Sequence, residues 1–184
     1  VNILLDTGAD VNAQSGHGGN SLQAASMTGN AQVIKIFLEA DADVNAQGGR
    51  WDNALQAASS HGYEQVVKIL LDAGADVNAQ DRTWGNALHT PSFHGHVQVV
   101  KVLLDADADV KARGEYRSRA RGEWCDGIAL QAASENGYDQ VVQLILEAGA
   151  VEDRFRDVIE STPRSLVREG HQEQRKRRYS EVSQ

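Results

Sequence analysis

One pentapeptide recurs at a constant interval along the chain. Asp10-Val11-Asn12-Ala13-Gln14 returns at 43–47 and again at 76–80, and a weaker copy begins after the same interval at Asp109. A fixed period of this length in 184 residues indicates that one supersecondary unit is stacked several times, each copy contacting only its neighbours. Such a stack offers a long side wall for binding and no closed pocket for chemistry.

The second copy, residues 44–76, shows what one unit contains. Asn53 stands three positions before Gln56, which predicts a capping box and the start of a first helix. Small residues continue that helix until Gly62, and a second helix from Tyr63 carries an apolar face. Gly74 then supplies a left-handed stop. The predicted unit is hairpin, helix, turn, helix, so the fold class is mainly α: an α-solenoid with β-hairpin edge loops.

The amino-acid sequence of the unit resembles the ankyrin repeat. The order is a cap, Ala-Leu-Gln-Ala-Ala, Gly, Val-Val-Lys-Ile-Leu-Leu and Ala-Gly-Ala-Asp-Val-Asn-Ala, and the resemblance covers residues 1 to about 151. The chain has Asn-(Ser/Ala)-Leu-Gln at 20–23 and 53–56 where the family usually has Thr-Pro-Leu-His, a wording similar to arrays of fungal multidomain proteins. The resemblance implies protein recognition without catalysis, through hairpin tips and first helices.

The pattern divides the chain into two parts, an array and a tail. Residues 1–151 are expected to form the array, with about four full repeats after a truncated one, because residues 1–6 align with the second helix at 67–72. We therefore expect the sequence to be a fragment with further repeats or domains upstream. Residues 152–184 form a polar tail, disordered or marginally helical; its basic cluster 175–178 is either a nuclear-import patch or a solvated end.

Charge and composition narrow the classes of partner. Residues 1–150 hold 10 Lys or Arg against 19 Asp or Glu, so the array should repel nucleic acid and anionic membranes. No run of 18 apolar residues and no secretory leader is present, and Cys125 is the single cysteine. These features favour an intracellular protein, cytoplasmic or nuclear.

Candidate partner-binding residues lie where the repeats differ. Trp51 and Trp84 share one hairpin-tip position, where they either contact a partner or pack on the neighbouring hairpin. Two consecutive positions after each first helix also vary, and the resemblance places them on the concave side. These are Met27, Ser60, Phe93 and Glu135 at the first position, and Thr28, His61, His94 and Asn136 at the second.

The fourth hairpin carries about nine extra residues, 115–123. The segment and its flank contain Arg117, Arg119, Arg121 and Trp124, so it is either a basic finger for an acidic partner or an exposed loop that tolerates insertion. We favour the loop.

No catalytic, cofactor or metal site is predicted. His89, His94 and His96 are assigned structural roles, and the acidic run at 105–109 lacks the glycine and the glutamate of a calcium loop. The main hypothesis is a non-enzymatic module that binds a protein partner. The alternatives are a sensing or substrate-recruiting arm of a larger enzyme or nucleotide-driven receptor, and an intramolecular brace.

Three residues mark weak points of the array. Pro91 occupies the place of alanine in sister repeats, and a helix that starts at Ala87 would lose one backbone hydrogen bond there, at a cost of ~3 kcal/mol. Asp41 and Asp107 replace glycine at left-handed stops, where Asp is tolerated less well.

Overall fold

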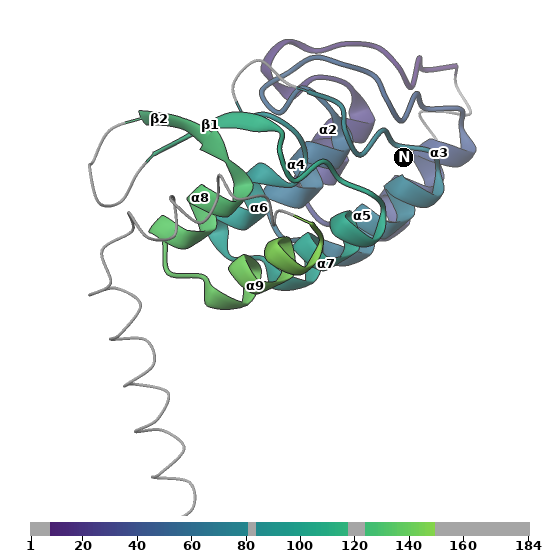
Figure 1. Ribbon diagram of the computed structural model, residues 1–184. Helices are drawn as coiled ribbons and strands as arrows, with labels where there is room; N and C mark the ends of the chain where they lie inside the picture. Colours follow the sequence, from purple (N-terminus) through teal and green to yellow (C-terminus); the bar gives the residue numbers. More distant parts are fainter. Residues whose placement is uncertain (1–7, 81–83, 118–123, 150–184) are drawn as a thin grey trace, which may run out of the picture.

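Four pairs of helices stack side by side in the computed structural model (Figure 1). The structure describes residues 8–80, 84–117 and 124–149. The first helices are α2 (Ser21–Ser26), α4 (Ala54–Ser60), α6 (His89–His94) and α8 (Ala129–Glu135). The second helices are α3 (Ala31–Glu39), α5 (Glu64–Asp72), α7 (Val97–Asp105) and α9 (Asp139–Glu147). The predicted mainly α solenoid is confirmed.

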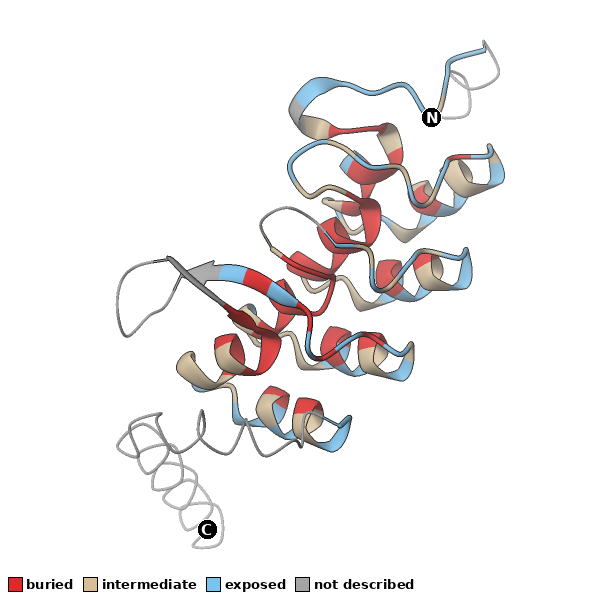
Figure 2. Ribbon diagram, turned by 45° about the horizontal axis from the view of Figure 1, so that its top comes forward, coloured by how far each residue is buried: buried red, intermediate tan, exposed pale blue. Residues whose placement is uncertain are grey.

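The two kinds of helix form two layers. Each first helix contacts the first helix of the next repeat, and the same holds for the second helices, while hairpin loops project along one edge (Figure 2). The short 3-10 helix η1 (Gly16–Gly18) lies in the first of these loops. Residues 1–7, and with them the expected cut helix, lie outside the described residues, as does the tail.

The core lies between the layers and between neighbouring repeats. One leucine in or directly before each first helix is fully buried: Leu22, Leu55, Leu88 and Leu130. The second helices add Ile34, Val67 and Val100, which are also fully buried. A single repeat has no such neighbour, so its apolar faces are buried only in the stack.

Two of the first helices, α2 and α4, begin at asparagine caps. The Asn20 side chain accepts from the Gln23 N–H, and Gln23 Oε1 accepts from the Asn20 N–H, which completes a capping box. Asn53 accepts from the Gln56 N–H at 2.8 Å as predicted, but its own N–H donates to the Trp51 carbonyl. The reciprocal half of that predicted box is therefore wrong.

The recurring pentapeptide connects successive repeats through its asparagine. Asn45 Nδ2 donates to the Gly74 carbonyl at 3.0 Å, and Asn45 Oδ1 accepts from the Asp76 N–H at 2.8 Å. Asn12 and Asn78 make the same two bonds to their following repeats. Lys111 takes this position in the fourth copy, and an ammonium group cannot accept from an N–H. The asparagine ladder therefore ends there.

Helix α6 begins later than predicted, which removes the expected cost of Pro91. Its first residue is His89, two positions beyond the start of α4 in the aligned repeats. Asn86 Oδ1 accepts from the Leu88 N–H and the Asn86 carbonyl from the His89 N–H, so a turn replaces the first helical residues. Pro91 is thus the third residue of α6, where a backbone N–H has no partner within the helix. The predicted kink and the weak third repeat are wrong in this respect.

The left-handed stops are as predicted. Asp41 and Asp107 have φ of 59° and 60°, and Gly74 has φ of 88°.

The insertion lengthens the fourth hairpin. Strand β1 (Arg113–Arg117) pairs antiparallel with β2 (Trp124–Ile128), and Arg117 lies opposite Trp124 in the register. Part of the insertion is therefore an ordered two-stranded ribbon, in contrast to the favoured exposed loop. Residues 118–123, with Arg119 and Arg121, lie outside the described part.

Replacing Pro91 by Ala should lower the free energy of unfolding by only ~0.5 kcal/mol, because proline at a compatible first-turn site restricts the unfolded chain. The matched change Ala58→Pro, at the equivalent position of α4, should cost ~3 kcal/mol or more, since the Ala58 N–H lies inside a formed helix. Urea titration of both variants measures this. A gain of ~1 kcal/mol for Pro91→Ala would show that α6 starts at Ala87.

Candidate functional site

Aromatic and imidazole rings from two neighbouring repeats meet on the array. Trp51 lies 6.1 Å from Trp84 and 5.7 Å from His61, measured between ring centroids, and His61 stacks on Tyr63 at 5.7 Å. We call Trp84, Trp51, His61 and Tyr63 the ring row. Trp51, Trp84 and Tyr63 are partly exposed and His61 is exposed. The ring row joins the hairpin-tip residues and the helix-end residues that the sequence singled out separately.

Trp51 reaches His61 over the side of α4. Trp51 precedes the first residue of α4 and His61 follows the last, yet their rings touch because His61 folds back until its Nδ1 lies 2.9 Å from the Ala57 carbonyl oxygen. Every residue of α4 is buried. Trp51 thus packs on the ring of Trp84 in the neighbouring hairpin, as one of the two alternatives predicted, and part of its surface stays exposed. Contact of these indoles with a partner stays a prediction.

The second variable position after each first helix has a shared structural role. The side chains of Thr28, His61, His94 and Asn136 each contact a carbonyl oxygen of the last turn of their own helix, at 2.7 to 3.0 Å. The last carbonyls of a helix have no partner within it, so these contacts satisfy them. The Nδ1 atom of His61 also lies 2.9 Å from the Ser60 hydroxyl oxygen, so this contact joins the side chains of both variable positions of that repeat.

The first variable position is less uniform. Met27, Phe93 and Glu135 are partly buried, and the Phe93 ring lies edge-on to His94 at 5.0 Å. Ser60 is buried, and its hydroxyl bonds to the Ala57 carbonyl at 2.9 Å. Ser60 therefore offers no surface to a partner in this arrangement.

A ring of the next repeat covers the glycine between the two helices of each of the first three repeats. A Cβ atom added to Gly29 would lie 2.7 Å from the Tyr63 ring, one on Gly62 2.8 Å from His96, and one on Gly95 2.5 Å from Tyr138. Sequence reasoning did not find these three rings in this role. The signal was present, because the first two rings follow their glycines at one constant interval and the third does so once the insertion is discounted.

His96 lies in a crowded group of imidazoles. It stacks on His94 at 5.7 Å and lies against Gly62. Burial lowers the pKa of His96 below its ordinary value of 6.5, and nearby His94 and His61 lower it further, while a hydrogen bond with the Ser60 backbone acts in the opposite direction. The ring is therefore held neutral to lower pH than an exposed histidine.

The hairpin β1–β2 extends the surface beyond Trp84. A Cβ atom on Gly114 would lie 2.4 Å from the Trp84 carbonyl oxygen, so β1 lies directly against the backbone of the preceding hairpin. Arg117 and Trp124 thus belong to a ribbon whose base adjoins the ring row. Glu135 and Asn136 lie at the end of α8, two first helices beyond α4, which ends next to His61.

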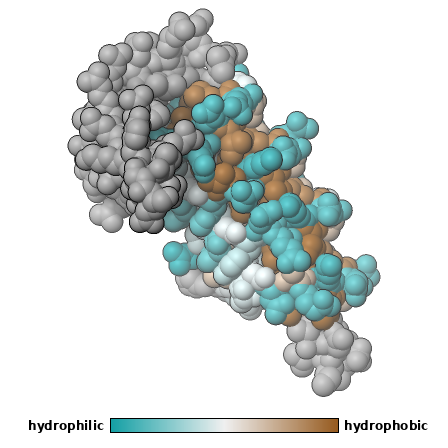
Figure 3. Space-filling model, turned by 90° about the horizontal axis from the view of Figure 1, so that it is seen from below, coloured by the Kyte–Doolittle hydropathy of each residue, from teal (hydrophilic) through white to brown (hydrophobic). Residues whose placement is uncertain are grey.

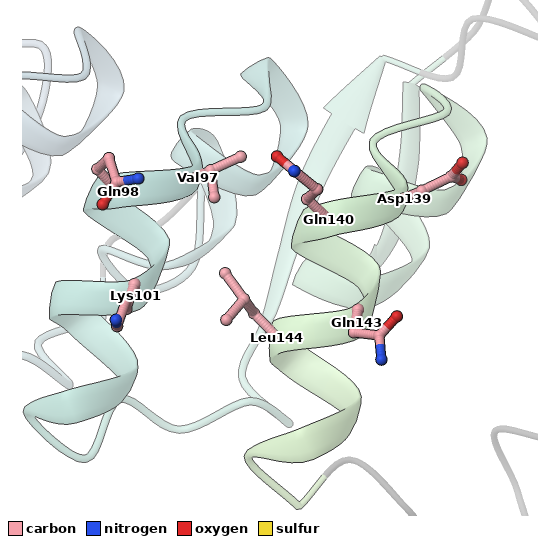
Figure 4. A pocket seen from close by; sticks show the side chains of 7 residues that line it. All are labelled: Val97, Gln98, Lys101, Asp139, Gln140, Gln143 and Leu144. Atoms are coloured by element: carbon pink, nitrogen blue, oxygen red, sulfur yellow. The ribbon is translucent and has the colours of Figure 1, made fainter. Parts of the chain in front are cut away.

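A separate groove of about 490 Å³ lies on the second-helix side, between α7 and α9. Val97 and Leu144 point toward each other across it, and its remaining lining is Gln98, Lys101, Asp139, Gln140 and Gln143 (Figure 4). Apolar side chains fill the gaps between polar ones on this face (Figure 3). The lining contains no nucleophile paired with a base.

Within the described ranges, no three or more His, Cys, Asp or Glu side chains are arranged to hold a metal ion. Nor does any described helix have the length and apolar character needed to cross a bilayer.

His96→Tyr should weaken the pH dependence of stability, because tyrosine occupies the equivalent positions 63 and 138 and does not titrate near neutrality. As the pH falls through 6.5, the unfolded chain takes up a proton that folded His96 resists, so the wild type loses stability. Above that value the effect is absent. In thermal melts, the melting temperature should fall less between pH 7.5 and pH 5.5 for His96→Tyr than for the wild type. An equal fall in both proteins would mean that His96 is not held neutral.

Comparison with known families agrees with this geometry. A family model described as ankyrin repeats, in three copies, matches residues 1–81, and a model for the ankyrin repeat matches residues 86–115. No curated protein matches the chain. The matched segments together span more than half of the chain and end within β1. Repeats of this kind are generally modules for protein–protein interaction and not catalysts. The chain therefore belongs to the ankyrin repeat family.

Proposed function

We propose that this array binds a protein partner through the ring row and the adjoining β1–β2 ribbon, without catalysing a reaction. The observation that carries the proposal is the contact of Trp51 with both Trp84 and His61, which joins rings of two repeats into one partly exposed surface. Tryptophan and tyrosine are over-represented among the residues that dominate binding energy, since each buries a large area at low entropic cost.

The frame behind these rings supports a binding role. The α4 helix under Trp51 is buried throughout, and His61 is held by its contact with the Ala57 carbonyl. Rings held in this way lose little conformational freedom when a partner binds, which favours affinity.

The charge of the array favours a protein partner over a nucleic acid. The ends of the second helices and the loops that follow them carry exposed acids: Asp41, Asp43, Asp72, Asp76, Asp105, Asp107 and Asp109. These carboxylates repel a phosphate backbone. Arg50 lies 5.4 Å over the Trp51 ring, so this ring face accepts a guanidinium group. Basic and aromatic side chains of a partner would fit the same face.

The test is selection of binders from a random peptide library on the full chain, followed by affinity measurement on variants. Trp51→Ala and Trp84→Ala should each weaken the selected peptides by roughly 30-fold, the scale of a hot-spot residue. The matched controls Lys101→Ala and Gln143→Ala, in the groove between α7 and α9, should leave affinity within about twofold. Circular dichroism of each variant confirms that it is folded.

The opposite pattern would refute the proposal: binders that depend on the groove residues and tolerate both tryptophan changes would place the recognition surface on the second-helix side.

A further inference from the structure

The free chain places one of its own cations on the ring row. The guanidinium carbon of Arg50 lies 5.4 Å from the centroid of the Trp51 ring, over its face. Arg50 is exposed, and no carboxylate of the described residues lies within ion-pair distance of it; the ion pair found among them joins Lys68 to Glu64. In an array that carries many exposed acids, this arginine therefore contacts an indole and not a carboxylate.

The backbone that carries Arg50 is held in place. The Gly48 N–H donates to the Asp52 carbonyl at 2.7 Å, which closes the tip of the second hairpin. A Cβ atom added to Gly49 would lie 2.7 Å from the backbone nitrogen of Gly19, so this tip packs directly on the tip of the first hairpin. The Arg50 side chain is long and exposed, so it is able to leave the indole while the tip keeps its shape.

Trp51 offers a partner its ring surface and not its N–H group. The Trp51 Nε1 atom is buried, and it has no hydrogen-bond acceptor among the described residues. An acceptor of a partner does not reach a buried atom unless the indole first moves. The residue as a whole is partly exposed, so the part of Trp51 that a partner contacts is the ring itself. Arg50 shows which chemistry this ring surface binds.

A guanidinium group suits this surface better than other groups. The face of an aromatic ring is the negative part of its quadrupole and attracts a cation. The guanidinium is planar and more weakly hydrated than an ammonium group, so it stacks on an indole at a smaller cost in hydration. Residues 1–150 hold 10 Lys or Arg against 19 Asp or Glu, which attracts a basic segment and repels an acidic one. Both effects favour arginine.

Arg50 is weakly held and is therefore a competitor that a partner can displace. A cation–π contact at an exposed site contributes little to stability, since water competes for the cation. A partner cation that uses the same ring face must first displace Arg50, which lowers its affinity by roughly threefold.

We infer that the ring row binds an arginine side chain of its protein partner, at the position on the Trp51 ring that Arg50 occupies in the free chain. The partner's guanidinium replaces that of Arg50, and the other rings of the row contact the residues beside it. The inference rests on the proposed function, to which it adds the chemistry of the partner and a competitor within the chain itself.

The test uses peptides that are selected on the full chain from a random library and that Trp51→Ala weakens. Arginine should be enriched among them. Replacing this arginine by citrulline, which keeps the shape and removes the charge, should weaken binding by about tenfold, and replacing it by lysine by about threefold. Arg50→Ala should strengthen the arginine peptides by roughly threefold and leave their citrulline forms within about twofold.

Two controls separate competition for the ring from a change in net charge. Lys101→Ala removes one positive charge in the groove between α7 and α9, and it should leave the affinity for the arginine peptides within about twofold. In the Trp51→Ala background, Arg50→Ala should no longer strengthen binding, because the shared position is lost. Circular dichroism of each variant confirms that it is folded.

Two results would overturn the inference while the proposed function stands. One is a set of Trp51-dependent peptides without enriched arginine, and the other is an Arg50→Ala variant that binds arginine peptides no more tightly than the wild type does. A selection that yields no Trp51-dependent peptide refutes the proposed function itself, and the inference with it.

Discussion

The interface between neighbouring repeats determines the rest of this structure. Val67 and Val100 are fully buried on second helices that contact the second helices of neighbouring repeats, so their apolar area counts toward stability only in the stack. Polar groups follow the same rule: the side-chain amide N–H groups of Gln23 and Gln56 donate to carbonyls of the next hairpin. The core and the hydrogen bonds therefore both require the next repeat to lie in a fixed position. This requirement explains the constant spacing between equivalent positions of the sequence.

This constraint separates positions that maintain the frame from positions that are free to serve binding. The second variable position after each first helix needs a donor for a terminal carbonyl, which explains Thr28, His61, His94 and Asn136 without reference to a partner. The hairpin tip has no such requirement, and there the chain places Trp51 and Trp84. Differences between repeats at the tip are thus better evidence for recognition than differences at the helix ends.

Much of the fold could be predicted from the sequence because its signals are local and repeated. The cap at Asn53, the stops at Gly74 and Asp107 and the fixed period each depend on a few neighbouring residues. The late start of α6 could not be predicted, since Asn86 closes a turn with Leu88 and His89 in place of the helix that its alignment with Asn53 suggests. The contact of Trp51 with His61 depends on how a side chain folds back over α4, which no spacing in the sequence encodes.

Native-state hydrogen exchange on Asn45→Ala is the most direct test of the claim that coupling between repeats holds the array together. Asn45 makes two bonds to the next repeat and stands on an exposed loop, so its loss removes coupling and leaves the core intact. The account predicts that the amides of α2 to α5 then open separately from those of α6 to α9, at a free energy ~1–2 kcal/mol lower. Unchanged exchange, with all helices still opening together, would contradict it.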